Sequence, residues 1–162
     1  MLLIIDSPEK LDFRGLKEVY SRSLLKAAQK NRKDISSEEQ KFRRYLQQEF
    51  FRLKGAVYYI WEEEGVYRSA LRMEPFEDGA LITGLETHPD FRGKGYGSAL
   101  MAAVLACDRV PDRVYSHIAP ANTASMKLHE KFGFTKILDF GRMIDGSIRS
   151  GFATFRFCKK SG

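Results

Sequence analysis

Three glycines alternate with a lysine and a tyrosine in the segment Gly93-Lys94-Gly95-Tyr96-Gly97, which follows Arg92. Glycine permits positive φ angles and a close approach of ligands, because it has no Cβ. The apolar run SALMAAVLAC comes next and predicts a helix. The first amides of a helix and the positive end of its dipole attract anions. With charged hydrogen bonds from Arg92 and Lys94, the segment predicts a phosphate site.

Two common phosphate motifs are excluded by the spacing. A Walker loop requires Gly-Lys followed by Ser or Thr, whereas Gly95 follows Lys94. The dinucleotide fingerprint requires GxGxxG, whereas this segment reads GxGxG. The sequence therefore favours neither a P-loop nor a Rossmann site.

The elements around this segment follow from hydrophobic periodicity and turn residues. Helices are expected at 13–27, from 36 onward with Ser36 and Glu39 at capping-box spacing, at 97–107 and at 122–132. Strands are expected in LLII, AVYYIW, VYRSALRM, ALITGLET, RVYSHIA, TKILDF and FATFRFC. The order β-α-α-β-β-β-α-β-α-β-β predicts an α/β fold with a mixed sheet and helices on both faces. A chain of 162 residues fits one domain, 1–162.

The amino-acid composition indicates the class of protein and its cellular compartment. A hydrophobic content of 43% indicates a folded globule, and no apolar run is long enough to cross a bilayer. The start, MLLIID, lacks the features of a signal peptide. Cys107 and Cys158 have no CxxC spacing, which predicts neither a disulfide framework nor a metal site. A cytoplasmic protein without a membrane partner is expected.

The net charge of +6 is concentrated in residues 12–54, which hold twelve Lys or Arg against six Asp or Glu. A basic surface attracts nucleic acid or phosphorylated cofactors. However, the aromatic residues of this segment share the apolar stripe and do not alternate with the arginines. Solvated helix faces are therefore favoured over a nucleic-acid-binding module.

Two motifs resemble those of the GNAT N-acetyltransferases. Arg92-x-x-Gly95-x-Gly97, at a strand-to-helix turn, is similar to the R/Q-x-x-G-x-G/A motif of that family. The run NTASMKLHEKFGF resembles its second motif, an Asn followed by a helix that ends in Lys-x-Gly-Phe. The resemblance extends from about Leu81 to Phe134. It implies a mostly antiparallel sheet splayed between strands four and five, and direct transfer of an acetyl group from acetyl-CoA to an amine, without a metal.

The resemblance also implies which residues bind the co-substrate acetyl-CoA. The amides from Gly93 to Gly97, with Arg92 beside them, would hold the pyrophosphate. Backbone groups of Leu85 and Thr87 would pair with the pantetheine arm as though it were an added strand. Asn122 would hydrogen-bond the arm from the other side of the opening, and Ser125 is a further candidate.

Glu86 is the candidate general base, acting directly or through water, and the amide of Thr87 is the candidate oxyanion donor. Glu86 interrupts an apolar strand, where an unpaired carboxylate is costly. The alternative is a strand glutamate held in a salt bridge.

The candidate acid for the leaving thiolate is His129. Family members often carry Tyr at this position, in the wording LYEKxGF, whereas this chain reads LHEKFGF. Histidine titrates near pH 6.5, so its acid form is a minority at pH 7 unless a carboxylate raises its pKa. The alternatives are a histidine without a catalytic role and a hydroxyl donor at Tyr96 or Tyr115.

Arg68 and Arg72 alternate onto one strand face and could bind a carboxylate of the acceptor. The acceptor itself, a small-molecule or peptide amine, is not identified by the sequence. Homodimerisation through a sheet edge is compatible with the resemblance. A protein that binds acetyl-CoA without transferring the acetyl group is the remaining alternative. A thiol relay through Cys107 is disfavoured, because an apolar helix does not stabilise a thiolate.

Overall fold

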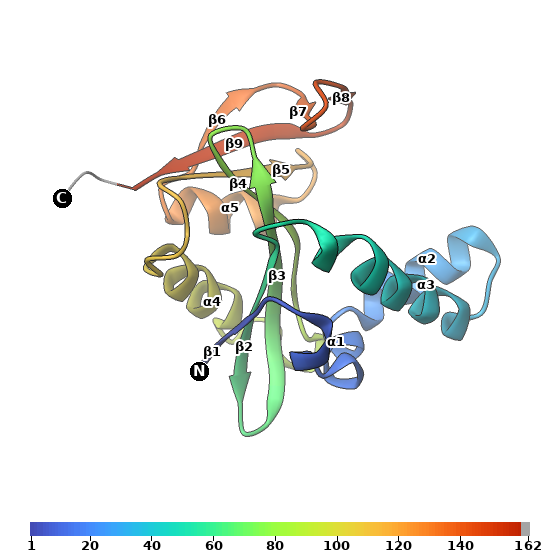
Figure 1. Ribbon diagram of the computed structural model, residues 1–162. Coiled ribbons are helices and arrows are strands. Elements are labelled where there is room, and N and C mark those ends of the chain that lie inside the picture. The colour runs from blue at the N-terminus through green and yellow to red at the C-terminus, as the bar shows by residue number, and fades with distance from the viewer. Residues whose placement is uncertain (160–162) are drawn as a thin grey trace.

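The computed structural model describes residues 1–159 and contains a seven-stranded sheet with the order β1-β2-β3-β4-β5-β9-β6 (Figure 1). All neighbouring strands are antiparallel except β4 and β5, which are parallel. The strands are β1 (Leu2–Ile5), β2 (Val57–Glu63), β3 (Val66–Phe76), β4 (Gly79–Thr87), β5 (Arg113–Ile118), β6 (Thr135–Leu138) and β9 (Ala153–Cys158). The predicted α/β fold with a mixed, mostly antiparallel sheet is confirmed.

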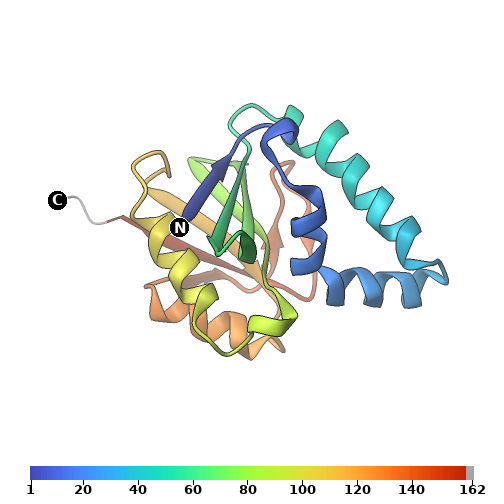
Figure 2. The same cartoon turned by 90° about the horizontal axis from the view of Figure 1, so that it is seen from below.

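Helices cover both faces of the sheet (Figure 2). One face carries α1 (Phe13–Val19), α2 (Ser21–Asn31) and α3 (Ile35–Gln48), and the other carries α4 (Tyr96–Leu105) and α5 (Thr123–Lys131). The short 3-10 helices are η1 (Pro8–Lys10), η2 (Phe50–Arg52) and η3 (Pro89–Phe91), and a small hairpin joins β7 (Gly141–Arg142) to β8 (Ile148–Arg149).

Two helix boundaries differ from those predicted. The helix expected at 13–27 is two helices, because Tyr20 leaves helical geometry with φ −95° and ψ 12°. The third helix is capped by Asp34, whose side chain accepts a hydrogen bond from the Ser37 amide at 2.8 Å. Ser36 therefore lies inside α3 and is not its cap.

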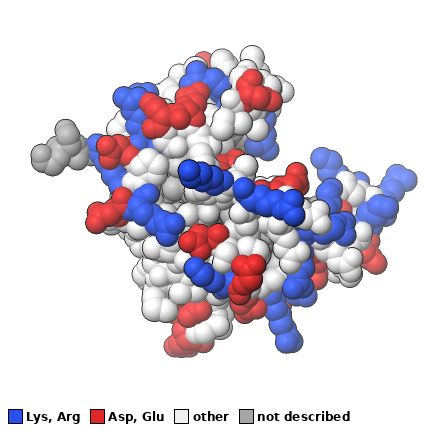
Figure 3. Space-filling model, viewed as in Figure 1, with Lys and Arg blue, Asp and Glu red and all other residues white. Residues whose placement is uncertain are grey.

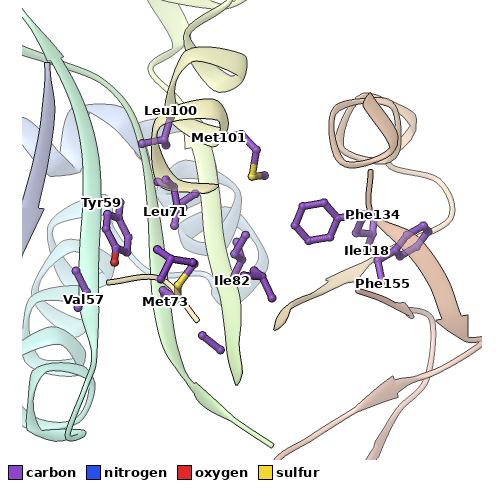
Figure 4. Close-up of a cluster of buried hydrophobic side chains, with 14 of the residues drawn as sticks. Val57, Tyr59, Leu71, Met73, Ile82, Leu100, Met101, Ile118, Phe134 and Phe155 are labelled. Atoms are coloured by element: carbon purple, nitrogen blue, oxygen red, sulfur yellow. The ribbon is translucent and has the colours of Figure 1, made fainter. Parts of the chain in front are cut away.

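The two faces bury separate apolar clusters. Leu100, Met101 and Val104 of α4 pack against Leu71 and other strand residues in the first cluster (Figure 4). The second cluster lies under α1, α2 and α3. Burying each large aliphatic side chain contributes about 1.5–3 kcal/mol. Both layers of helices are therefore fixed against the sheet by apolar packing.

The strands β4 and β5 pair only over a short stretch, Ala80↔Val114 to Ile82↔Ser116. Both strands continue beyond this stretch without pairing to each other, which confirms the predicted opening between the fourth and fifth strands. A β-bulge lies in the same part of β4, because the register shifts between Ala70↔Glu86 and Arg72↔Thr83. Gly84, with φ +59°, lies in this bulge.

Candidate functional site

A cleft of about 770 Å³ lies where β4 and β5 diverge. Its walls come from β3, β4 and β5 together with α2, α3, α5 and the β8 strand. A cleft of this volume is in the range that binds small molecules and cofactors. Of the predicted site residues, Leu85, Glu86, Asn122, Ser125 and His129 line it, and so does Arg72.

Backbone groups of β4 face the opening between the strands. The amide of His88 donates to the Arg68 carbonyl in β3 at 2.8 Å. Successive residues of an antiparallel strand direct their backbone groups to opposite sides. Thr87 therefore directs its amide and carbonyl away from β3, whereas Leu85 lies in the bulge, where this alternation is interrupted. The backbone groups of Thr87 are positioned to pair with an extended ligand segment.

The glycine loop leads into the first turn of α4. Gly93 and Gly95 have φ angles of +75° and +85°, and a Cβ on either would meet no atom within 4 Å. Gly95 is the N-cap, so the amides of Tyr96, Gly97 and Ser98 have no acceptor within the helix. The loop thus combines a bare, open surface with first-turn amides that lack an acceptor within α4, and these features fit a phosphate group.

Positive side chains surround the loop. Arg92 and Lys94 are exposed, and Lys131 of α5 donates to the Ser98 hydroxyl at 3.2 Å. Across the opening, Asn122 caps α5 by accepting a hydrogen bond from the Ser125 amide at 3.2 Å. Its Oδ1 atom is thereby engaged, and its Nδ2 group is the part that could donate to a ligand.

Glu86 projects from the bulged part of β4 into the cleft. One carboxylate oxygen accepts a hydrogen bond from the Ser23 hydroxyl of α2, and the other is buried without a partner in the described residues 1–159. Burial raises the pKa of the Glu86 carboxyl, although the Ser23 hydroxyl and the nearby charge of Arg92 oppose this effect. No salt bridge to Glu86 forms within residues 1–159.

A chain of hydrogen bonds ends at the bulge. Arg72 Nη1 donates to the Tyr58 hydroxyl at 3.2 Å, which donates to the Tyr20 hydroxyl at 2.7 Å, which in turn donates to the Gly84 carbonyl. Burial raises the pKa of Tyr58 to about 12 and the pKa of Tyr20 well above its ordinary value. Both hydroxyls are therefore protonated donors that fix the bulge.

His129 is 1% exposed on α5, and its Nδ1 atom lies 2.7 Å from the Ser125 carbonyl oxygen. A carbonyl only accepts, so Nδ1 carries the proton. Burial lowers the pKa of His129, and the ring is neutral at pH 7. Its Nε2 atom, buried without a partner in the described chain, is then an acceptor. This geometry speaks against the predicted role of His129 as proton donor.

The two alternative hydroxyl donors point elsewhere. The Tyr96 hydroxyl donates to Glu63 Oε2 at 2.9 Å, and the Tyr115 hydroxyl donates to Asp78 Oδ1 at 2.6 Å. Neither residue lines the cleft. Tyr96 stays a candidate only through its backbone amide in the glycine loop.

The structure separates Arg68 from Arg72. A bulge in β3, marked by the register shift between Trp61↔Ser69 and Glu62↔Tyr67, turns Arg68 to the opposite face of the sheet. The Arg68 guanidinium lies 3.8 Å from the centre of the Phe91 ring, outside the cleft. The prediction that the two arginines share a face is wrong, because a bulge breaks the alternation on which it rested.

Sequence reasoning missed several residues of the cleft. Ser23 sits on a polar helix face and carries no motif, so no signal in the sequence identifies it. Tyr20 and Tyr45 were assigned to the apolar stripe, which is correct, yet both also line the cleft. The isolated Gly84 within a strand is a signal that could have located the bulge.

The sequence model of the acetyltransferase (GNAT) family matches residues 21–134. The chain therefore belongs to the GNAT acetyltransferase family. No curated protein sequence matches it.

Solved structures show the same fold at low sequence identity. PH1933 from Pyrococcus horikoshii OT3 superposes with a TM-score of 0.69 at 16% identity, over 99% of each chain. The ribosomal-protein-S18-alanine N-acetyltransferase from Escherichia coli gives 0.65 at 17% identity, over 100% of this chain and 97% of that one. YncA from Salmonella typhimurium, solved with its cofactor acetyl-CoA, gives 0.61 at 17% identity, over 99% of this chain and 95% of that one.

Lys and Arg side chains gather over the α2–α3 end of the molecule, with Asp and Glu among them (Figure 3). The aromatic residues of these helices pack toward the sheet in the second apolar cluster. Within residues 1–159, no helix is long and apolar enough to span a membrane, and no group of His, Cys, Asp and Glu side chains is arranged to hold a metal ion.

Proposed function

We propose that this protein is an acetyl-CoA-dependent N-acetyltransferase that transfers the acetyl group directly to an amine. The observation that carries the proposal is the half-buried carboxylate of Glu86, one oxygen of which is buried without a partner in residues 1–159, in a cleft at the opening between β4 and β5. Membership of the GNAT family supports it. The structure of YncA supports acetyl-CoA as the co-substrate, because that protein has the same fold and was solved with this molecule.

The residues present fit acetyl-CoA. The open backbone at Gly93 and Gly95 and the unpaired first-turn amides of α4 suit its pyrophosphate. Thr87 directs backbone groups to the side where the pantetheine arm would lie, and Leu85 and Asn122 line the cleft next to it, with the Nδ2 group of Asn122 free to donate. When bound, acetyl-CoA supplies an acetyl group that is activated as a thioester.

Glu86 is the proposed general base. Its unpartnered oxygen takes the proton from the ammonium group of the acceptor, directly or through water, while Ser23 holds the other oxygen in place. The Thr87 amide donates to the oxygen of the acetyl carbonyl as negative charge develops there. The amine nitrogen attacks the carbonyl carbon, and the new C–N bond replaces the C–S bond. The second proton that the nitrogen loses passes through water to the released thiolate. His129, neutral and without a proton on Nε2, is not the proton donor in this proposal.

The test is an assay of acetyl transfer with a panel of amines. Release of free coenzyme A thiol and the mass of the acetylated amine are measured for the wild-type protein and for Glu86→Gln. We expect acetylation by the wild type and a rate 10²- to 10⁴-fold lower in the variant, since a general base contributes about that factor. Binding of acetyl-CoA without an acetylated product would indicate a binding protein without transferase activity.

A further inference from the structure

Arg72 is a half-buried cation without an ionic partner. No carboxylate lies within 4.0 Å of its guanidinium in the described residues 1–159. Its hydrogen bond to the Tyr58 hydroxyl is to a neutral group, and its Nε atom is buried without a partner. Removing a charge from water without a counter-ion is costly. The guanidinium therefore lacks a directly bonded counter-ion within residues 1–159, although its charge also acts on Glu74 and Glu86 at longer range.

Aromatic rings hold the guanidinium in place without neutralising it. The centres of four rings lie 5.4 to 5.9 Å from Arg72 Cζ, namely those of Tyr20, Phe42, Tyr45 and Tyr58. Contacts of this kind are attractive within about 6 Å. On the remaining side the guanidinium lies against the bulge, since a Cβ on Gly84 would come within 2.7 Å of Arg72 Cζ. The side chain is thus fixed at the wall of the cleft.

Arg72 and Glu86 lie on neighbouring strands, on the same face of the sheet. Glu86 pairs with Ala70, which is two residues from Arg72 along β3. A register shift separates this pair from Arg72↔Thr83, and Arg72 is near enough for its charge to act on the Glu86 carboxyl and oppose the rise in its pKa. An acceptor whose amine meets Glu86 would place an anionic group on Arg72 only if few bonds separate the two groups.

The other cations of the cleft are exposed to solvent. Lys41, Arg44 and Arg149 line it, and so do the carboxylates of Glu38 and Glu49. Glu74, two residues from Arg72 on the same strand, is half-buried, and burial raises its pKa. Arg72 is therefore the group that would distinguish an acceptor with a nearby anion from one without.

From these observations we infer that the acceptor is a compact amino acid or amino-acid analogue, whose carboxylate binds Arg72 while its amine faces Glu86. This inference rests on the proposed transferase function and deepens it. A protein amino terminus would not satisfy the site in the same way, because its first residue carries a neutral amide in place of the carboxylate. The guanidinium fork is suited to bidentate binding of a carboxylate.

The test compares kcat/KM for the common amino acids with kcat/KM for the same amino acids as C-terminal amides, with acetyl-CoA as donor. We expect at least one free amino acid to exceed its amide by tenfold or more, and Arg72→Gln to abolish the difference. The comparison of free amino acids with their amides on the wild-type protein tests the inference even if Arg72→Gln does not fold. Binding of acetyl-CoA, measured separately, shows whether the variant is folded.

Two results would overturn the inference. If amides or short peptides are acetylated as fast as free amino acids, the acceptor is not recognised through its carboxylate, although the protein is a transferase. If Arg72→Gln binds acetyl-CoA and keeps the full preference, another residue binds the carboxylate. Failure to acetylate any amine would instead refute the transferase function itself.

Discussion

Replacing Glu86 by Gln should make the protein more stable and less active at the same time. Burial raises the pKa of Glu86, so the fold disfavours its ionised form. At pH 7 the ionised Glu86 therefore lowers the free energy of unfolding of the wild type. This loss of stability disappears as the pH falls through the raised pKa of Glu86 toward the ordinary pKa of glutamate. Each unit of pKa shift corresponds to about 1.4 kcal/mol. Glutamine has the same shape without the charge and can still accept the Ser23 hydrogen bond.

Glu63→Gln is the matched control with the opposite sign. Glu63 accepts hydrogen bonds from Trp61 at 3.2 Å and Tyr96 at 2.9 Å, and these lower its pKa. The ionised form of Glu63 therefore stabilises the folded protein at pH values above the ordinary pKa of glutamate. This stabilisation is lost as the pH falls through the lowered pKa of Glu63. The control should lose stability and keep most of its activity.

Urea denaturation at pH 7 and initial rates of coenzyme A release measure both effects. The expected pattern is a higher free energy of unfolding with a 10²- to 10⁴-fold lower rate for Glu86→Gln. If Glu86→Gln is instead destabilised like the control, the carboxylate is a structural partner. A stabilised variant with full activity would refute the role of Glu86 as base.

Two further predictions concern the glycine loop and the buried histidine. Gly95→Ala and Gly65→Ala each place a Cβ in open space, at φ angles of +85° and +74°, so each should cost about 1–2 kcal/mol of stability. Only Gly95→Ala should also weaken acetyl-CoA binding, by tenfold or more in a calorimetric titration. Equal affinities of the two variants would show that the glycine loop does not bind the pyrophosphate. Burial lowers the pKa of His129, so stability should fall as the pH drops below the unfolded value near 6.5, by about 1.4 kcal/mol per pH unit down to the folded pKa. Unfolding of His129→Gln across the same pH range should show a shallower slope, and an unchanged slope would contradict the assignment.

The backbone geometry of the glycine loop could be predicted because its signals are local. Glycines, flanking cations and the start of a helix lie within a few residues of one another, and the backbone geometry at Gly93 and Gly95 follows from residue type. The order of elements was predictable for the same reason, since each depends on periodicity within a short window.

The side of the cleft under α2 and α3 could not be predicted, because it depends on contacts between distant residues. Tyr20 reaches Gly84 across 64 positions, and Tyr58 reaches Tyr20 across 38. Bulges in β3 and β4 also change which side chains share a face, and a single extra residue suffices to reverse a strand's alternation. Arg68 was misplaced for this reason.

Thermal unfolding with and without acetyl-CoA, for the wild type and Arg92→Glu, tests most directly whether the opening between β4 and β5 is a cofactor site. A ligand at one hundred times its dissociation constant stabilises a protein by about 2.7 kcal/mol, or roughly 5 to 10 °C for a domain of this size. The account predicts a shift of that order for the wild type and its loss in Arg92→Glu. No shift at saturating acetyl-CoA would contradict it, because the glycine loop would then be only a turn.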